Sequence, residues 1–286
     1  MKKLAIFVAA LFGVATFSPL RAEQRALVRL SVVSMRAKAS HTAEQVSQAL
    51  MGTPVTVLER GAEWSRVQTP DGYSGWIINH SLVFPSAAEM QQWSGAPKVM
   101  ITHPFELHDA DRRTDLVAGN VLVAAGDSLR LPDGRMILAP AGAFAPLDSL
   151  SSRPFEPEAL PRFAELYMGV PYLWGGLSSK GMDCSGLVRM AYAAQGRILP
   201  RDARQQAPLG REIPADSLRS GDLIFFGNPE TGRITHVAIY DKGGEYVHAS
   251  QLVRRNSLDS RSQLYLPLKV VSRRRIQGRP MAPLYR

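Results

Sequence analysis

Three side chains in the second half of the chain have the types that nucleophilic catalysis by a thiol requires. Cys184 is the only cysteine among the 286 residues, and His236 and His248 follow it in two short apolar segments. A free thiol is only about a few per cent ionised at neutral pH, so a nucleophilic cysteine needs a base that takes its proton. His236 can be that base, and His248 can hold its far ring nitrogen and fix the tautomer. These residues predict a cysteine nucleophile served by two histidines.

The expected position of Cys184 favours a reactive thiol. It follows a loop that contains Gly175, Gly176 and Gly181, and it precedes a segment, 185–195, whose apolar residues recur at helical spacing. A thiol in the first turn of a helix faces unpaired backbone N–H groups and the positive end of the helix dipole, and both favour the thiolate. The alternative is a small buried hydrophobic residue, which is what most free cysteines are.

The two histidines are expected on adjacent strands joined by a hairpin at 241–244. If the loop is the three residues 241–243, Tyr240 pairs with Gly244, and His236 lies directly opposite His248 on one face of the sheet. A loop of even length would put the two rings on opposite faces, because side chains alternate along a strand.

Tyr172 lies in the loop ahead of Cys184 and can donate its hydroxyl to a developing oxyanion, beside the backbone N–H of Cys184. The alternative for Tyr172, and for Trp174 nearby, is a packing aromatic, and the two histidines alone could be satisfied core residues. A zinc site is a further chemical option, but it would lack a short-spaced ligand pair and is disfavoured. Its four ligands would be Cys184, His236, His248 and Asp183.

Short alternating strands separated by turns predict a small β-barrel over residues 26–84. The turn Thr69-Pro-Asp-Gly72 combines a fixed φ, a side-chain cap and a glycine that accepts positive φ. The stretch from Leu50 to Ile77, with its Asp71-Gly-Tyr-Ser-Gly-Trp76 hairpin, resembles the bacterial SH3-like domain. Residues 85–97 predict a helical linker, because Ser86 and Glu89 have the spacing of a capping box.

Residues 98–148 weakly repeat the first barrel and predict a divergent second SH3-like barrel that arose by internal duplication. A boundary rich in Ser and Pro follows at 149–158. Residues 155–286 predict a third domain in which helices, including the one that starts near Cys184, precede several strands. Helices followed by an antiparallel sheet are typical of an α+β domain.

Charge and composition limit the function classes. The formal net charge is +9, but the basic residues are scattered, and no basic face with interleaved aromatics or nucleic-acid module is visible. Residues 1–22 predict an export signal, because Lys2 and Lys3 precede an apolar run too short to span a bilayer. We therefore expect a soluble, exported protein, periplasmic or extracellular, without stable membrane insertion. A lone cysteine in such a compartment is a liability unless it is buried or functional.

The motifs of the third domain, in their order, resemble those of the NlpC-type papain-like cysteine peptidases of bacterial cell walls. The match covers about residues 158–280 and rests on five segments. By this resemblance, Cys184 is the nucleophile, His236 the base, His248 the third member, and Tyr172 lies near the oxyanion. The segments are Pro171 to Gly176, Met182 to Val188, Pro200 to Asp202, Arg219 to Phe226, and Thr235 to Ala249.

SH3-like barrels ahead of this domain further resemble the γ-D-glutamyl-L-diamino acid endopeptidases, which cut wall stem peptides with a free N-terminal L-Ala. That resemblance implies that Asp202 anchors the substrate ammonium, helped by Tyr73 and Glu44 of the first barrel. Ala203 stands where the family usually has a serine, so one polar contact to the substrate is missing. The other expected substrate-binding residues flank the nucleophile: Asp183, which can also cap the helix, Ser185 and Trp174.

The resulting prediction is a cysteine endopeptidase of peptidoglycan stem peptides that works through an acyl-enzyme, without metal or cofactor and without nucleic acid as a partner. Two alternatives stay open: a transpeptidase or acyltransferase with the same triad, and an inactive wall-binding protein that acts through its SH3-like barrels. The sequence leaves open the oligomeric state and whether the diamino acid is diaminopimelate or lysine.

Overall fold

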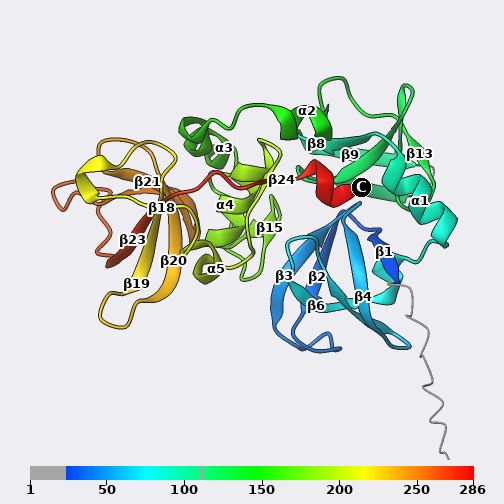
Figure 1. Cartoon of the computed structure of the whole chain (residues 1–286), viewed down its shortest axis with the longest axis horizontal. Coiled ribbons are helices and arrows are strands. Elements are labelled where there is room, and N and C mark those ends of the chain that lie inside the picture. The colour runs from blue at the N-terminus through cyan, green and yellow to red at the C-terminus, as the bar shows by residue number, and fades with distance from the viewer. Residues whose placement is uncertain (1–23, 110–111) are drawn as a thin grey trace, which may run out of the picture.

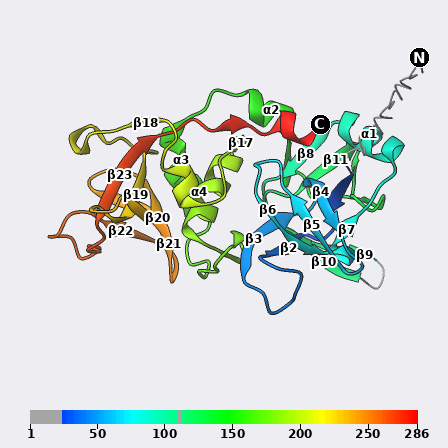
Figure 2. The same cartoon turned by 60° about the horizontal axis from the view of Figure 1, so that its bottom comes forward.

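The computed structural model describes residues 24–109 and 112–286, which form three parts in the order of the sequence (Figure 1). Two β-rich parts lie beside each other at one end, and a mixed α/β part follows at the other. Figure 2 shows helices α3 and α4 between the last sheet and the two β-rich parts. The expected export signal, 1–22, lies outside the described residues. No helix in the described ranges is long and apolar enough to cross a membrane.

The first part is a seven-stranded antiparallel sheet with the order β3-β2-β6-β5-β4-β1-β7. Its alternating inward residues, among them Met35, Val67 and Ile77, fill one core. The expected turn between β5 and β6 is present: Gly72 has a φ of +88°, and Thr69 N donates to Tyr73 O at 2.9 Å. The strands are β1 (Arg25–Val28), β2 (Val32–Arg36), β3 (Gln45–Leu50), β4 (Pro54–Arg60), β5 (Trp64–Gln68), β6 (Ser74–Ile78) and β7 (Leu82–Val83), with a 3-10 turn at Asn79–Ser81.

Helix α1 (Ala87–Gly95) links the first two parts, and its start confirms the capping box, because Ser86 and Glu89 bind each other's backbone N–H. The second part has a five-stranded sheet in the order β13-β12-β11-β8-β14 and a separate hairpin of β9 and β10. Helix α2 (Leu147–Ser152) closes it. The strands are β8 (Lys98–Ile101), β9 (Phe105–Asp109), β10 (Arg112–Leu116), β11 (Val121–Ala125), β12 (Ser128–Arg130), β13 (Met136–Ile137) and β14 (Phe144–Pro146).

The third part packs helices against one face of a six-stranded antiparallel sheet with the order β18-β23-β19-β20-β21-β22. Its core joins α4 to β20 and β21 through apolar residues such as Leu187, Val237 and Val247. The helices are α3 (Leu160–Glu165), α4 (Cys184–Ala193) and α5 (Ala203–Gln206), with 3-10 turns at Pro157–Ala159, Ala215–Ser217 and Ala282–Tyr285. The sheet strands are β18 (Arg211–Glu212), β19 (Leu223–Asn228), β20 (Arg233–Tyr240), β21 (Glu245–Ser250), β22 (Leu252–Ser257) and β23 (Val270–Arg275).

Two details of this part differ from expectation. The sequence pattern predicts a strand from Tyr265 to Val271, but β23 begins at Val270, because Pro267 has no N–H to give to a ladder. Strand β22 was not predicted at all, although it pairs with β21 along its whole length. Short pairs outside the main sheet are β15 (Leu177–Ser178) with β16 (Gly181–Met182), and β17 (Arg197–Ile198) with β24 (Arg279–Pro280).

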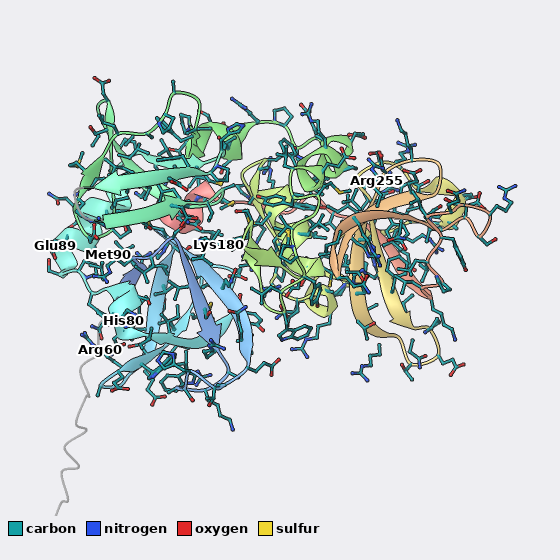
Figure 3. All side chains as sticks on the ribbon, turned by 180° about the vertical axis from the view of Figure 1, so that it is seen from behind. Arg60, His80, Glu89, Met90, Lys180 and Arg255 are labelled. Atoms are coloured by element: carbon teal, nitrogen blue, oxygen red, sulfur yellow. The ribbon has the colours of Figure 1, made fainter. Side chains whose placement is uncertain are left out.

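Two of the ion pairs between the third part and the β-rich parts differ in burial. Arg189 of α4 binds Asp71 of the first part at 2.8 Å, and that carboxylate is only 1% exposed. Lys180 binds Asp115 of the second part at the same distance, but these side chains are 50% and 35% exposed. Figure 3 shows Lys180 at this junction. The two pairs have the same length and different burial, so they contribute differently to stability.

We expect Arg189→Ala to lower the free energy of unfolding by about 3 kcal/mol, because it leaves the Asp71 carboxylate buried and unpaired. The matched control, Lys180→Ala, breaks an exposed pair and should cost less than about 1 kcal/mol. Urea denaturation followed by tryptophan fluorescence measures both. Equal losses in the two variants would contradict the assigned difference.

Candidate active site

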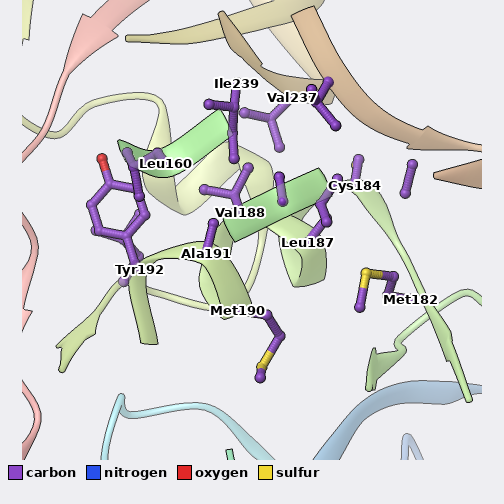
Figure 4. Close-up of a cluster of buried hydrophobic side chains, with 14 of the residues drawn as sticks. Leu160, Met182, Cys184, Leu187, Val188, Met190, Ala191, Tyr192, Val237 and Ile239 are labelled. Atoms are coloured by element: carbon purple, nitrogen blue, oxygen red, sulfur yellow. The ribbon is translucent and has the colours of Figure 1, made fainter. Parts of the chain in front are cut away.

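Cys184 is the first residue of α4, and Asp183 caps this helix by accepting a hydrogen bond from Gly186 N at 2.7 Å. The backbone N–H groups of Ser185 and of Val237 on β20 act on the thiol and favour its ionised form. Figure 4 labels Cys184 at this end of α4 and Val237 in the same apolar cluster. Cys184 is 7% exposed, so its thiol lies between helix α4 and the sheet. The residue of β20 that acts on it is Val237, which directly follows His236 in the sequence.

The two histidine rings contact each other: His236 Nε2 lies 2.7 Å from His248 Nδ1. The predicted register was wrong, because Tyr240 pairs with Tyr246 and not with Gly244. Gly244 has positive φ and the turn closes at Glu245, so the loop is longer by two residues. A shift of two preserves the face, and the histidines therefore meet diagonally instead of directly opposite.

Asn256 of β22 extends this pair and was missed by the sequence analysis. Its Oδ1 lies 2.9 Å from His248 Nε2, and its Nδ2 donates to Leu264 O at 2.7 Å, which fixes the orientation of the amide. His248 must then donate through Nε2 and accept through Nδ1, so His236 donates through Nε2. The Nδ1 atom of His236 is left with its lone pair available as a base. No local pattern marked Asn256, because only the pairing of β21 with β22 brings it to His248.

Burial sets the protonation of the thiol and the imidazoles. It raises the pKa of Cys184 to about 11, with the nearby Asp183 charge adding to the rise. Burial also lowers the pKa of His236 to about 3 and the pKa of His248 to about 4. The sequence predicts a thiolate from the helix terminus, but desolvation of the charged form outweighs the dipole here. In the free protein the thiol and both imidazoles are neutral.

Tyr172 lies beside the thiol. Burial, followed by the charge of Cys184, raises the pKa of its phenol to about 12, so the hydroxyl stays protonated and can donate. Its backbone N donates to Gln251 O at 2.8 Å, which ties the loop to the turn between β21 and β22.

A buried ion pair fixes the start of the cysteine helix, and its arginine was also missed. Arg201 is 1% exposed and binds Asp183 at 2.6 and 3.0 Å. It also contacts Ser185 Oγ at 3.0 Å and reaches Ser47 Oγ of β3 at 3.0 Å. Both oxygens of Asp183 are already bound by protein donors, including Gly175 N at 2.9 Å. Asp183 and Ser185 therefore position the helix, and their predicted contact with substrate stays a prediction.

A cleft leads from Cys184 to the edge of the first part. Trp174 Nε1 donates to Glu44 Oε1 at 2.8 Å, which joins the two walls. Tyr73 donates to Val46 O at 3.4 Å, and its pKa is raised by burial and then by the Asp202 carboxylate nearby. The structure thus brings together the predicted residues of both parts. The lining includes Glu44, Tyr73, Trp174, Cys184, Asp202 and Ala203.

No group of three or more His, Cys, Asp or Glu side chains with the geometry of a metal site occurs in residues 24–109 and 112–286. Of the four residues considered for zinc, the three besides Cys184, namely His236, His248 and Asp183, make the hydrogen bonds described above.

Comparison with known proteins gives the family. Residues 169–272 match the model of the NlpC/P60 family, and residues 31–83 match that of the bacterial SH3 domain. The chain is 32% identical over 264 residues to dipeptidyl-peptidase 6 of Lysinibacillus sphaericus, covering 84% of this chain and 94% of that protein. It is 29% identical over 220 residues to γ-D-glutamyl-L-lysine dipeptidyl-peptidase of Bacillus subtilis, covering 71% of each.

The fold agrees with these matches. The crystal structure of an NlpC/P60 family protein from Bacillus cereus superposes with a TM-score of 0.76 at 21% identity, covering 89% of this chain and 100% of that one. The sequence matches and the shared fold together establish that this chain belongs to the NlpC/P60 family of cysteine peptidases and carries a bacterial SH3 domain ahead of its peptidase domain.

Proposed function

We propose that this chain hydrolyses the bond between γ-D-glutamate and the diamino acid in peptidoglycan stem peptides that begin with a free L-Ala. The observation that carries the proposal is the cleft that joins Cys184 to the carboxylates Glu44 and Asp202. Two relatives with the names γ-D-glutamyl-L-lysine dipeptidyl-peptidase and dipeptidyl-peptidase 6 support it. Both names describe release of a dipeptide, which requires recognition of a free N-terminus.

The proposed chemistry uses a relay of four side chains. Cys184 Sγ attacks the γ-carbonyl carbon while its proton passes to His236 Nδ1, and His248 and Asn256 hold the imidazolium that forms. Tyr172 and the backbone N–H of Cys184 donate to the oxyanion. His236 then gives the proton to the leaving amine, and an acyl-enzyme remains. Water, deprotonated by His236, attacks the thioester and releases L-Ala-D-Glu and free Cys184.

The other end of the cleft suits the ammonium of the substrate. Asp202 and Glu44 lie there with Tyr73, and the cation paired with Asp202 is Arg204, at 3.3 Å and with a side chain that is 77% exposed. A partly buried carboxylate is stabilised by a positively charged partner. The ammonium of a free N-terminus therefore stabilises the complex of enzyme and substrate. An acylated or polymer-linked L-Ala has no such charge. The first barrel thereby selects free stems, while Trp174 forms a wall and Ala203 leaves one polar contact unmade.

The domain organisation around this function is also part of the proposal. The five-stranded sheet and hairpin of residues 98–148 support a divergent second SH3-like domain, with 26–84 as the first, 85–97 as the helical linker and 155–286 as the peptidase domain. Residues 1–22 are proposed to direct export to the periplasm or the cell exterior, where stem peptides occur.

Loss of the nucleophile is the first test. Cys184→Ala should reduce hydrolysis of L-Ala-γ-D-Glu-diaminopimelate by at least about 10⁴-fold, because no other side chain can form the acyl-enzyme. Mass spectrometry of the released L-Ala-D-Glu measures this. The variant should still bind the peptide by calorimetry, and retained turnover would contradict the proposal. Product analysis with added amine separates hydrolysis from acyl transfer.

The ammonium site is tested with Asp202→Asn. We expect kcat/KM for the free tripeptide to fall by about 10²-fold, since a charge-assisted contact is lost, with little change for the N-acetylated tripeptide. Asp216→Asn, at an exposed aspartate in the 3-10 turn Ala215–Ser217, is the matched control. An equal loss of kcat/KM on both peptides would show that Asp202 does not recognise the ammonium.

The protonation of the thiol is tested by alkylation. Because the pKa of Cys184 is raised to about 11, the thiolate fraction is small at neutral pH and grows as the pH rises. The rate of reaction with iodoacetamide should therefore increase through pH 8 to 10, about tenfold for each pH unit. Mass spectrometry reports the single modified residue directly. A rate that is constant from pH 5 to 8 would indicate a thiolate–imidazolium pair at rest instead.

A further inference from the structure

A second hollow is lined by His236, and neither Asp202 nor Glu44 belongs to its wall. Its wall is formed by the ends of β19 and β20 and by the segment ahead of β23, and it includes Asn228, Arg233, His236 and Lys269. Arg233 and Thr235 also line the cleft that holds Cys184, so the two hollows adjoin along β20. Cys184 lines the first of these hollows and His236 lines the second.

This position corresponds to the leaving group of the proposed reaction. The acyl half of the substrate occupies the cleft toward Asp202, and His236 must protonate the leaving nitrogen from the opposite side. The part of the substrate attached to that nitrogen is the diamino acid. It therefore extends into the second hollow.

The charge of the hollow is positive. Arg233 and Lys269 are both exposed, and neither makes a side-chain ion pair or hydrogen bond within the described residues. No Asp or Glu lines the hollow; Glu230 lies in the turn between β19 and β20 but is not part of the wall. Asn228 accepts from the backbone of Glu230 at 2.9 Å through Oδ1, which leaves its amide Nδ2 as a free donor.

The two diamino acids of cell-wall peptides differ in the charge at the end of the side chain. Lysine ends in an ammonium alone, whereas diaminopimelate carries a carboxylate beside its ammonium. Two unpaired cations attract the carboxylate and repel a lone ammonium, and an arginine can bind a carboxylate through two N–H groups.

We propose that this hollow is the binding site of the leaving diamino acid and that Arg233 and Lys269 select diaminopimelate over lysine by binding its side-chain carboxylate. The inference rests on the proposed function. Both cations are exposed, so each contributes modestly, and their combined preference is on the order of tenfold in kcat/KM.

The test compares three synthetic tripeptides, L-Ala-γ-D-Glu with meso-diaminopimelate, with its side-chain carboxamide, or with L-lysine. The wild-type chain should cleave the carboxylate form about tenfold faster than the other two, and added salt should reduce the preference. Arg233→Ala and Lys269→Ala should each reduce the ratio of the rate on the diaminopimelate peptide to the rate on the lysine peptide about threefold. The double variant Arg233→Glu and Lys269→Glu should cleave the lysine peptide faster than the diaminopimelate peptide.

Lys242→Ala removes an exposed lysine from the opposite end of β20 and is the matched control, which should keep the wild-type ratio. Equal rates on the three peptides, or a ratio that the Arg233 and Lys269 variants leave unchanged, would overturn the assignment of this hollow while the proposed function stands. Cleavage of none of the peptides would overturn the proposed function, and this inference with it.

Discussion

The guanidinium of Arg201 is buried, and its ion pair with the carboxylate of Asp183 offsets the free-energy cost of removing that charge from water. An isolated charge in the interior is strongly destabilising, whereas a pair with all its hydrogen bonds made is stable in one geometry only. Asp183 is also the N-cap of α4, so the pair fixes the direction in which Cys184 points. Ser47 of the first barrel completes the contacts of Arg201 and ties that barrel to the same point.

Cys184 and the two histidines are largely removed from solvent, although Cys184 and His236 each line an open hollow. Burial disfavours the charged form of Cys184 and of both histidines, so the relay is held neutral and in one tautomer. Asn256 is what fixes this tautomer, because its amide is oriented by Leu264 O. In the proposed mechanism, charge separates only when an electrophilic carbonyl is in place, which would limit side reactions of the only thiol in the chain.

Local sequence patterns predict much of this arrangement and fail where the partner is distant. The glycine-rich loop, the cap of α4 and the strands that carry the histidines all follow from short-range signals. Arg201 is different: in the sequence it is one more charged loop residue, and only the folded chain brings it to Asp183 and Ser47. Asn256 lies on a strand that the pattern did not mark. The hairpin register failed because two adjacent glycines, Gly243 and Gly244, allow a longer turn than the shortest one.

The edge strand β3 of the first barrel supplies Ser47 to the buried arginine, and its neighbouring residues supply one wall of the cleft. A barrel that only tethered the enzyme to the wall could be exchanged for another by recombination of gene segments. Here such an exchange would remove a ligand of Arg201 and open the end of the cleft. The two domains are therefore structurally interdependent, and a substitution in β3 can disturb contacts made by residues of the other domain.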